Sequence, residues 1–168
     1  MVKIEPKVLR AGDQWPTRGE PLFALITGPH AWERFLKEQH AHTWSWPDIN
    51  WEQEVLLVAL MGAKRTGGYR IALRQVVITD HQVTVQVEER SPQPGEMVIQ
   101  VLTSPFQIVA IPRDVLPTGT FTLVFSGKKG QKWEVTVENA TEDAMYTAQP
   151  TFIQPAKERY TPSAPADR

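Results

Sequence analysis

The histidines are the residues whose spacing comes closest to metal chemistry. His40 and His42 are two positions apart, so in a strand their side chains would point to the same side and could share an ion. His30 lies upstream, with Glu33 and Glu38 nearby. A helix between His30 and His40 would, however, separate them by roughly three turns. We therefore expect a solvated helix end and no metal site. The absence of cysteine also excludes sulfur-ligated zinc.

Hydrolytic and phosphate chemistry find no support in the remaining polar residues. Nucleophilic hydrolysis needs a serine or threonine beside a histidine and a third orienting group. Four serines lie in expected turns, and none of them has a histidine and an orienting group beside it in the sequence: Ser45, Ser91, Ser104 and Ser126. The segment Gly127 to Gly130 lies between two expected strands and not before a helix, which indicates a hairpin tip and not a phosphate-binding loop. We expect no catalytic residues and no cofactor.

Three tryptophans could instead bind a ligand by stacking. Trp44, Trp46 and Trp51 cluster in one short segment, and such clusters stack on sugars or bases or anchor an interface. An exposed row of these rings would indicate a carbohydrate-binding module. The alternative is that the segment folds over a sheet and closes the core beside Trp32.

The segment from Gly62 to Leu73 is the strongest candidate for a binding loop. Gly67 and Gly68 can take positive φ without steric penalty, so we expect a tight hairpin at residues 64–69. This hairpin would present Arg65, Thr66, Gly67, Gly68 and Tyr69 to a partner. The alternative is that the glycines only make a turn and Tyr69 packs inside.

A single helix is expected over residues 29–40. Pro29 suits the first helical turn, with Thr27 or Gly28 at the cap. Trp32, Phe35 and Leu36 form an apolar stripe at helical spacing. We therefore expect this helix to lie across a sheet with its aromatic rings buried.

From residue 54 onward the hydrophobic period is two. Residues 82–88 and 132–138 alternate between apolar and polar side chains, as in strands with one wet face. Residues 55–61 are apolar on both sides, which indicates a central strand between the other sheet and the helix. Short strands separated by turn residues predict a mainly β fold, an antiparallel β-sandwich or barrel with one covering α-helix. We expect one domain over 1–146 and a Pro-rich, flexible C-terminal tail over 147–168.

Three segments carry a resemblance to a known family: Glu54 to Met61, Gly62 to Leu73 with its Thr-Gly-Gly-Tyr core, and Val101 to Pro112. They resemble the C-terminal domain of PrcB-family protease-complex subunits over roughly Asp48 to Pro112. The resemblance implies a small bacterial β-domain that accompanies a protease in a complex and is not known as an enzyme. It implies a protein partner, with a protease as the candidate, met through Thr66 to Tyr69.

Composition limits the other function classes. The net charge of −1 argues against a nucleic-acid partner, because phosphate binding needs a cationic surface. The longest apolar run, Val55 to Met61, is too short to span a bilayer, so we expect no membrane span. The N-terminus lacks the apolar core of a signal peptide, so we expect a cytoplasmic protein if the sequence is complete and an exported one if a leader was removed. A structural, self-assembling protein and a homo-oligomer remain open alternatives.

Overall fold

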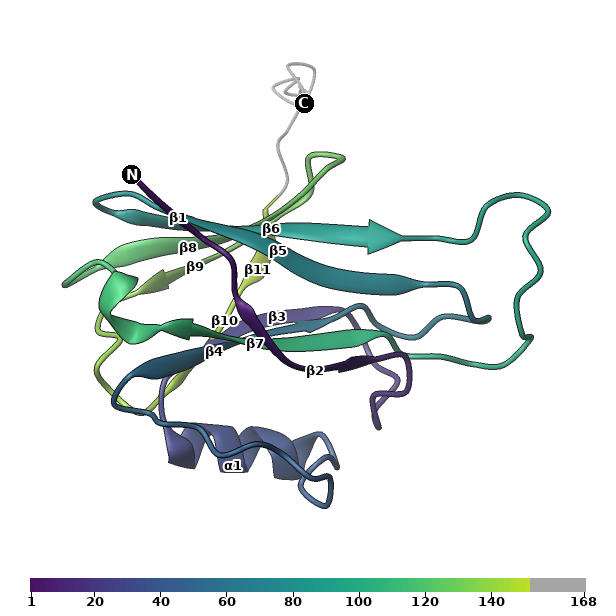
Figure 1. Ribbon diagram of the computed structural model, residues 1–168, viewed down its shortest axis with the longest axis horizontal. Helices are drawn as coiled ribbons and strands as arrows, with labels where there is room; N and C mark the ends of the chain where they lie inside the picture. The colour runs from purple at the N-terminus through teal and green to yellow at the C-terminus, as the bar shows by residue number, and fades with distance from the viewer. Residues whose placement is uncertain (152–168) are drawn as a thin grey trace, which may run out of the picture.

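The computed structural model shows two β-sheets stacked face to face, with one helix on the outer side of the second sheet (Figure 1). The structure describes residues 1–151. The expected β-sandwich with one covering helix is confirmed, and the two sheets do not close into a barrel within the described residues. Most of the expected C-terminal tail, residues 152–168, lies outside the described residues.

The first sheet, sheet A, has six strands among the described residues. In order across the sheet they are β1 (Val2–Ile4), β5 (Arg70–Ile78), β6 (Gln82–Arg90), β8 (Phe121–Gly127), β9 (Lys132–Val137) and β11 (Gln149–Thr151). Strands β6 and β8 run parallel, and the other pairs of this sheet run antiparallel. The expectation of antiparallel pairing therefore has this one exception. It arises because the chain between β6 and β8 first crosses to the other sheet as β7.

The second sheet, sheet B, is antiparallel and has five strands among the described residues. In order they are β10 (Met145–Thr147), β3 (Leu22–Ile26), β4 (Glu54–Leu60), β7 (Phe106–Pro112) and β2 (Lys7–Gly12). A short 3₁₀ turn, η1 (Arg113–Val115), follows β7. The central strand β4 is buried along almost its whole length. This confirms the position predicted from its continuous apolar run.

The edge strands of both sheets come from the two ends of the described chain. The N-terminal segment supplies β1 at one edge of sheet A and then β2 at the edge of sheet B. The C-terminal segment supplies β10 and then β11 at the two opposite edges. Between them Ala148 is buried, and its N–H donates to the carbonyl of Phe23 at 2.8 Å. Strand pairing thus continues to Thr151, past residue 147, where the tail was expected to begin.

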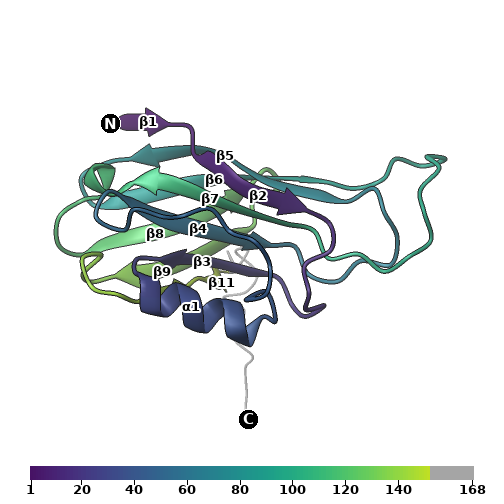
Figure 2. The same ribbon diagram turned by 60° about the horizontal axis from the view of Figure 1, so that its bottom comes forward.

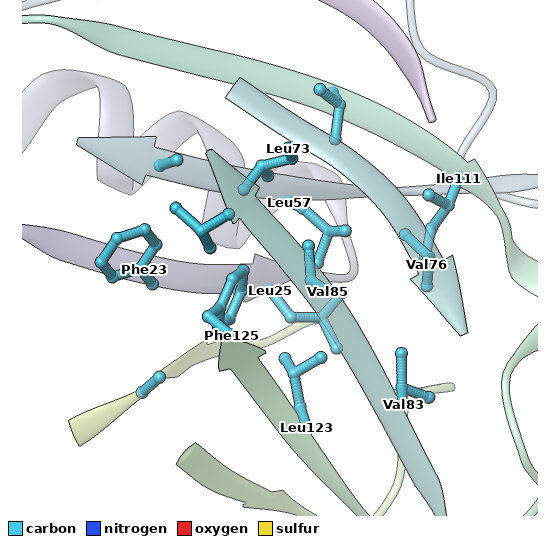
Figure 3. Close-up of a cluster of buried hydrophobic side chains, with 14 of the residues drawn as sticks. Phe23, Leu25, Leu57, Leu73, Val76, Val83, Val85, Ile111, Leu123 and Phe125 are labelled. Carbon is cyan, nitrogen blue, oxygen red and sulfur yellow. The ribbon is translucent and has the colours of Figure 1, made fainter. Parts of the chain in front are cut away.

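The main core lies between the two sheets. Phe23, Leu25 and Leu57 of sheet B face Val85 and Phe125 of sheet A in this core (Figure 3). The rings of Phe23 and Phe125 are 5.3 Å apart between centroids. The residues that alternate with these in sheet B point the other way, into a second core. Sheet B therefore has apolar side chains on both faces.

The second core lies between sheet B and helix α1 (Pro29–Glu38), which runs beneath the sheet in Figure 2. Trp32, Phe35 and Leu36 are buried in it, as the helical spacing predicted. The helix ends two residues before the expected boundary at His40. His40 has a positive φ of 60°, and the N–H of Ala41 bonds to the carbonyl of Leu36 at 2.8 Å. His40 thus terminates the helix.

Candidate protein-binding site

The loop that contains the two glycines connects the two sheets. Strand β4 belongs to sheet B and β5 to sheet A, so residues 61–69 cross from one sheet to the other. The expected tight hairpin is therefore wrong, because its two flanking strands do not pair. Gly68 has the expected positive φ, at 92°, whereas Gly67 does not. The positive φ turns the chain into β5 at the point where it changes sheets.

A second segment, the long connection between β6 and β7, lies alongside this loop. The N–H of Gly67 donates to the carbonyl of Ile99 at 2.9 Å. Lys64 and Thr103 exchange two backbone hydrogen bonds of 2.8 and 2.9 Å, and Thr103 Oγ1 donates to the carbonyl of Thr66 at 2.8 Å. Figures 1 and 2 show both segments projecting beyond the sheets. We call residues 63–69 and 91–102 together the tip.

The tip carries large apolar side chains in contact with solvent. Met97 is 96% exposed, Ile99 65%, Leu102 55% and Val101 47%. Isolated exposed apolar residues are common on protein surfaces, but a cluster on one projecting segment is typical of an interaction site. These residues follow the turn at Pro94 and Gly95, outside any strand.

Ion pairing fixes the longer segment of the tip at its base. Arg90, at the end of β6, bonds to both carboxylate oxygens of Glu96, at 2.9 and 3.0 Å, and to the carbonyl of Gly68 at 2.7 Å. The backbone N–H of Gln93, followed by the Arg90 guanidinium, lowers the pKa of Glu96. The carboxylate thus remains ionised at neutral pH and holds the two segments of the tip against each other.

The residues predicted to form the binding site have different environments in the tip. Arg65 is exposed, Thr66 and Gly68 are half-buried, and Gly67 is buried. Tyr69 is also half-buried and packs against the core between the sheets, with the Lys64 ammonium 5.3 Å from its ring centroid. The structure thus brings all five together. Arg65 is the most accessible of them, and Gly67 and Tyr69 help to support the loop.

Sequence reasoning missed the apolar residues of the longer segment. The signal was present as the run Met97, Val98 and Ile99, followed by Val101 and Leu102, between a Pro-Gly turn and the next strand. An apolar run normally predicts a buried strand. Here it lies in a segment that pairs with residues 64–67 through only a few bonds, so most of its side chains have no sheet to pack against.

The tryptophan cluster packs against the second core. The ring of Trp44 lies 5.5 Å from that of Trp15, and the ring of Trp46 lies 5.1 Å from that of Trp32. The guanidinium of Arg10 covers Trp44 at 4.1 Å. Trp51 also packs against this core, and each of the three candidate rings is half-buried. The carbohydrate hypothesis depended on an exposed row of these rings, and the described residues form none.

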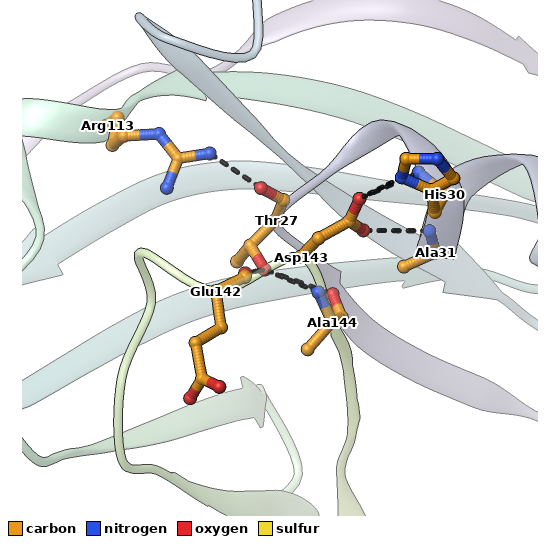
Figure 4. Close-up of polar contacts among 7 residues, drawn as sticks. All are labelled: Thr27, His30, Ala31, Arg113, Glu142, Asp143 and Ala144. Atoms are coloured by element: carbon orange, nitrogen blue, oxygen red, sulfur yellow. Dashed lines mark hydrogen bonds and ion pairs between the residues drawn. The ribbon is translucent and has the colours of Figure 1, made fainter.

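His30 interacts with an acidic residue at the start of the helix. Asp143 accepts hydrogen bonds from the backbone N–H groups of His30 and Ala31, each at 2.9 Å, and lies 2.8 Å from His30 Nδ1 (Figure 4). Burial raises the pKa of Asp143, but the bonds from Ala31 and His30 outweigh it and leave the pKa below its ordinary value. The N-cap residue Gly28 makes no side-chain bond, so Asp143 caps the helix in its place.

Asp143 belongs to a larger polar network. Thr27 Oγ1 bonds to the carbonyls of Glu142 and Ala144, and the guanidinium of Arg113 donates to the carbonyl of Thr27 at 2.6 Å (Figure 4).

Among the described residues, no three His, Asp or Glu side chains gather closely enough to hold a metal ion. No helix within residues 1–151 is long and apolar enough to cross a membrane.

Comparison with known proteins finds one matching family model. Residues 55–112 match the family model described as PrcB C-terminal, which confirms the resemblance seen in the sequence. The matched segment runs from β4 to the end of β7 and includes the whole tip. Among curated proteins and solved structures, no match to this chain is found.

Proposed function

We propose that this chain is a non-catalytic binding subunit of a protease complex, because residues 55–112 match the family model described as PrcB C-terminal. Its partner, with a protease as the candidate, contacts the tip. The exposed apolar side chains carry the proposal, because burying them against a partner would remove them from water.

The shape of the tip supports this assignment. Four large apolar side chains extend from a segment that is held by backbone bonds at Gly67 and Thr103 and by the ion pair of Arg90 with Glu96. A segment already fixed in place loses less conformational entropy on binding than a free loop does. Arg65 adds an exposed cation to the same tip. Arginine is one of the residue types enriched among those that dominate binding energy.

The test compares three forms of the chain as bait for proteins of the source organism. The tip variant combines Met97→Ser with Ile99→Ser. The matched control is Val8→Ser, which removes an apolar side chain that is 51% exposed on β2, outside the tip. The captured proteolytic activity and the melting midpoint of each bait are measured. We expect the tip variant to capture at least roughly ten-fold less activity and the control to capture as much as the parent.

The free energy of unfolding of both variants should lie within about 0.5 kcal/mol of that of the parent, as is usual for exposed substitutions. Equal capture by the tip variant and the parent would contradict the proposed contact. Size-exclusion chromatography of the parent supplies a second check. If the parent is a dimer that the tip variant separates into monomers, the tip joins two copies of the chain and the proposal of a protease partner fails.

A further inference from the structure

A cleft of about 740 Å³ opens between the two sheets behind the tip. Its walls come from the end of β2, the first half of β5, the end of β6 and the start of β7. Its lining includes Ile71 and Gln107, the arginines Arg70, Arg74 and Arg90, and the carboxylates of Glu88 and Glu96. Its volume is within the usual range for ligand pockets. The cleft lies beside the end of β2, several residues after the N-terminal segment has crossed from sheet A to sheet B.

The strand edge that faces this cleft is partly open. Strand β1 pairs only with residues 76–78 of β5, so the described residues provide no neighbouring strand for residues 70–74 on that side. The hydrogen-bonding direction alternates along an antiparallel strand. Leu73 directs its N–H away from β6, and Ile71, two residues earlier, has the same orientation. The N–H and C=O of Ile71 therefore face the cleft.

Gln107 takes the place of a neighbouring strand at one position of this edge. Its Oε1 accepts the N–H of Leu73 at 2.7 Å, which also establishes the orientation of the side-chain amide. Gln107 is only 8% exposed, and its Nε2 makes no hydrogen bond to the residues that the structure describes. A buried amide nitrogen normally has a partner. This side chain lines the cleft, so an acceptor in the cleft would complete its bonding.

We infer that the cleft binds an extended peptide segment of another protein, which adds as a strand to the open edge of β5. The backbone of the peptide would bond to the N–H and C=O of Ile71, and one of its carbonyls would accept from Gln107 Nε2. This is the recognition mode in which backbone bonds give affinity and side-chain pockets give selectivity.

The charges around the cleft favour recognition through the peptide backbone. Arg74 pairs with Glu88 at 2.7 Å, and Arg90 pairs with Glu96. Two of the three arginines that line the cleft thus pair with carboxylates that also line it. The cleft has little unbalanced charge to select a strongly acidic or basic peptide. The cleft shares Gly68, Tyr69 and Glu96 with the base of the tip, but it does not include the exposed side chains of Met97 and Ile99.

The probe is a phage-displayed library of random peptides, selected on the immobilised full chain. The tightest binder is synthesised, and its affinity is measured for the parent, for Gln107→Glu and for Gln86→Glu. The carboxylate that Gln107→Glu introduces would still accept the Leu73 N–H but would have no N–H to donate. Gln86 lies exposed on β6 and serves as the matched control. We expect roughly ten-fold weaker binding to Gln107→Glu and no change for the control.

A second measurement does not depend on any variant of the protein. The peptide is resynthesised with one backbone nitrogen methylated at a time. Strand addition predicts that methylation abolishes binding at alternate positions and is tolerated at the positions between them. Amide hydrogen exchange at Ile71 should also slow in the complex. The inference would be overturned if the peptide bound Gln107→Glu as tightly as the parent, or if methylation did not show the alternating pattern. A library that yields no peptide whose affinity depends on Gln107 would also overturn it.

Discussion

The two ends of sheet B differ in the environment of their side chains. At one end, where β3 leads into the helix and β7 ends, the polar groups of Thr27, Arg113 and Asp143 are bonded to backbone from distant parts of the chain (Figure 4). At the other end, the tip leaves large apolar side chains in water. The first arrangement stabilises the fold, and the second contributes little to it. This contrast indicates that the two ends serve different purposes.

The largest expected effect lies on the helix side of sheet B. Trp32 is buried, and its ring lies 6.0 Å from Phe35 and 5.1 Å from Trp46 between centroids. Trp32→Ala should lower the free energy of unfolding by about 3–5 kcal/mol, the cost of removing a packed aromatic side chain. Chemical denaturation of the parent and the variant measures this loss of stability. Met97→Ala at the tip, as the control, should stay within about 0.5 kcal/mol of the parent. Equal losses would remove the contrast between the two ends.

A smaller effect should appear where the tip joins sheet A. An added Cβ at Gly68 would lie 2.8 Å from both Pro92 Cγ and Val98 Cγ1, on top of the positive φ of 92°. Gly130 has a similar φ of 88° but no neighbouring atom within 4 Å of an added Cβ. Gly130→Ala should therefore cost about 1–2 kcal/mol from backbone strain alone. Gly68→Ala should cost measurably more in a thermal melt. Equal costs would show that the two segments of the tip are not packed together in solution.

The smallest effect concerns the helix cap and depends on pH. Asp143→Ala should cost about 0.5–2 kcal/mol near neutral pH, as loss of an N-cap does. The folded protein lowers the pKa of Asp143, so its ionised form contributes stability above the unfolded carboxyl pKa of about 3.9. That contribution is lost as the pH falls through the lower folded value. Denaturation at neutral and acidic pH measures it.

Asp143→Asn keeps the shape of the side chain and removes its titration. The difference in stability between parent and Asp143→Asn should therefore shrink as the pH falls. The exposed Asp114→Asn, in the 3₁₀ turn, is the control for loss of one negative charge. A difference that stays constant over the acid range would show that the charge of Asp143 does not stabilise the helix.

The regular elements were predictable where one local pattern decided them. The helix followed from Pro29 and the stripe of Trp32, Phe35 and Leu36, and the central position of β4 followed from its apolar run. Gly28 is the N-cap residue, one of the two expected, but the capping side chain could not be predicted, because Asp143 is distant in sequence and no local spacing connects it with His30. Gly28 leaves the space that Asp143 occupies, since an added Cβ there would overlap the carboxylate.

The candidate site was predictable only in part. The two glycines marked a turn, and Gly68 does have a positive φ, but strand periodicity does not tell which sheet a strand joins. Residues 64–69 were therefore predicted to form a hairpin, whereas they belong to a crossing between the sheets. The supporting contact with Ile99 and Thr103 depends on that crossing, which explains why the apolar segment of the tip went unnoticed.

The two ends of the described chain form the edge strands of both sheets, and this has a mechanical consequence. A force that pulls residues 1 and 151 apart would load the pairs of β1 with β5 and of β11 with β9 before it reached the inner strands. Each of those pairs is only three residues long and would yield first. Strands β4 to β7, which carry the tip, would keep their pairing while the outer strands detached. The tip could thus keep its structure while the outer strands are under tension.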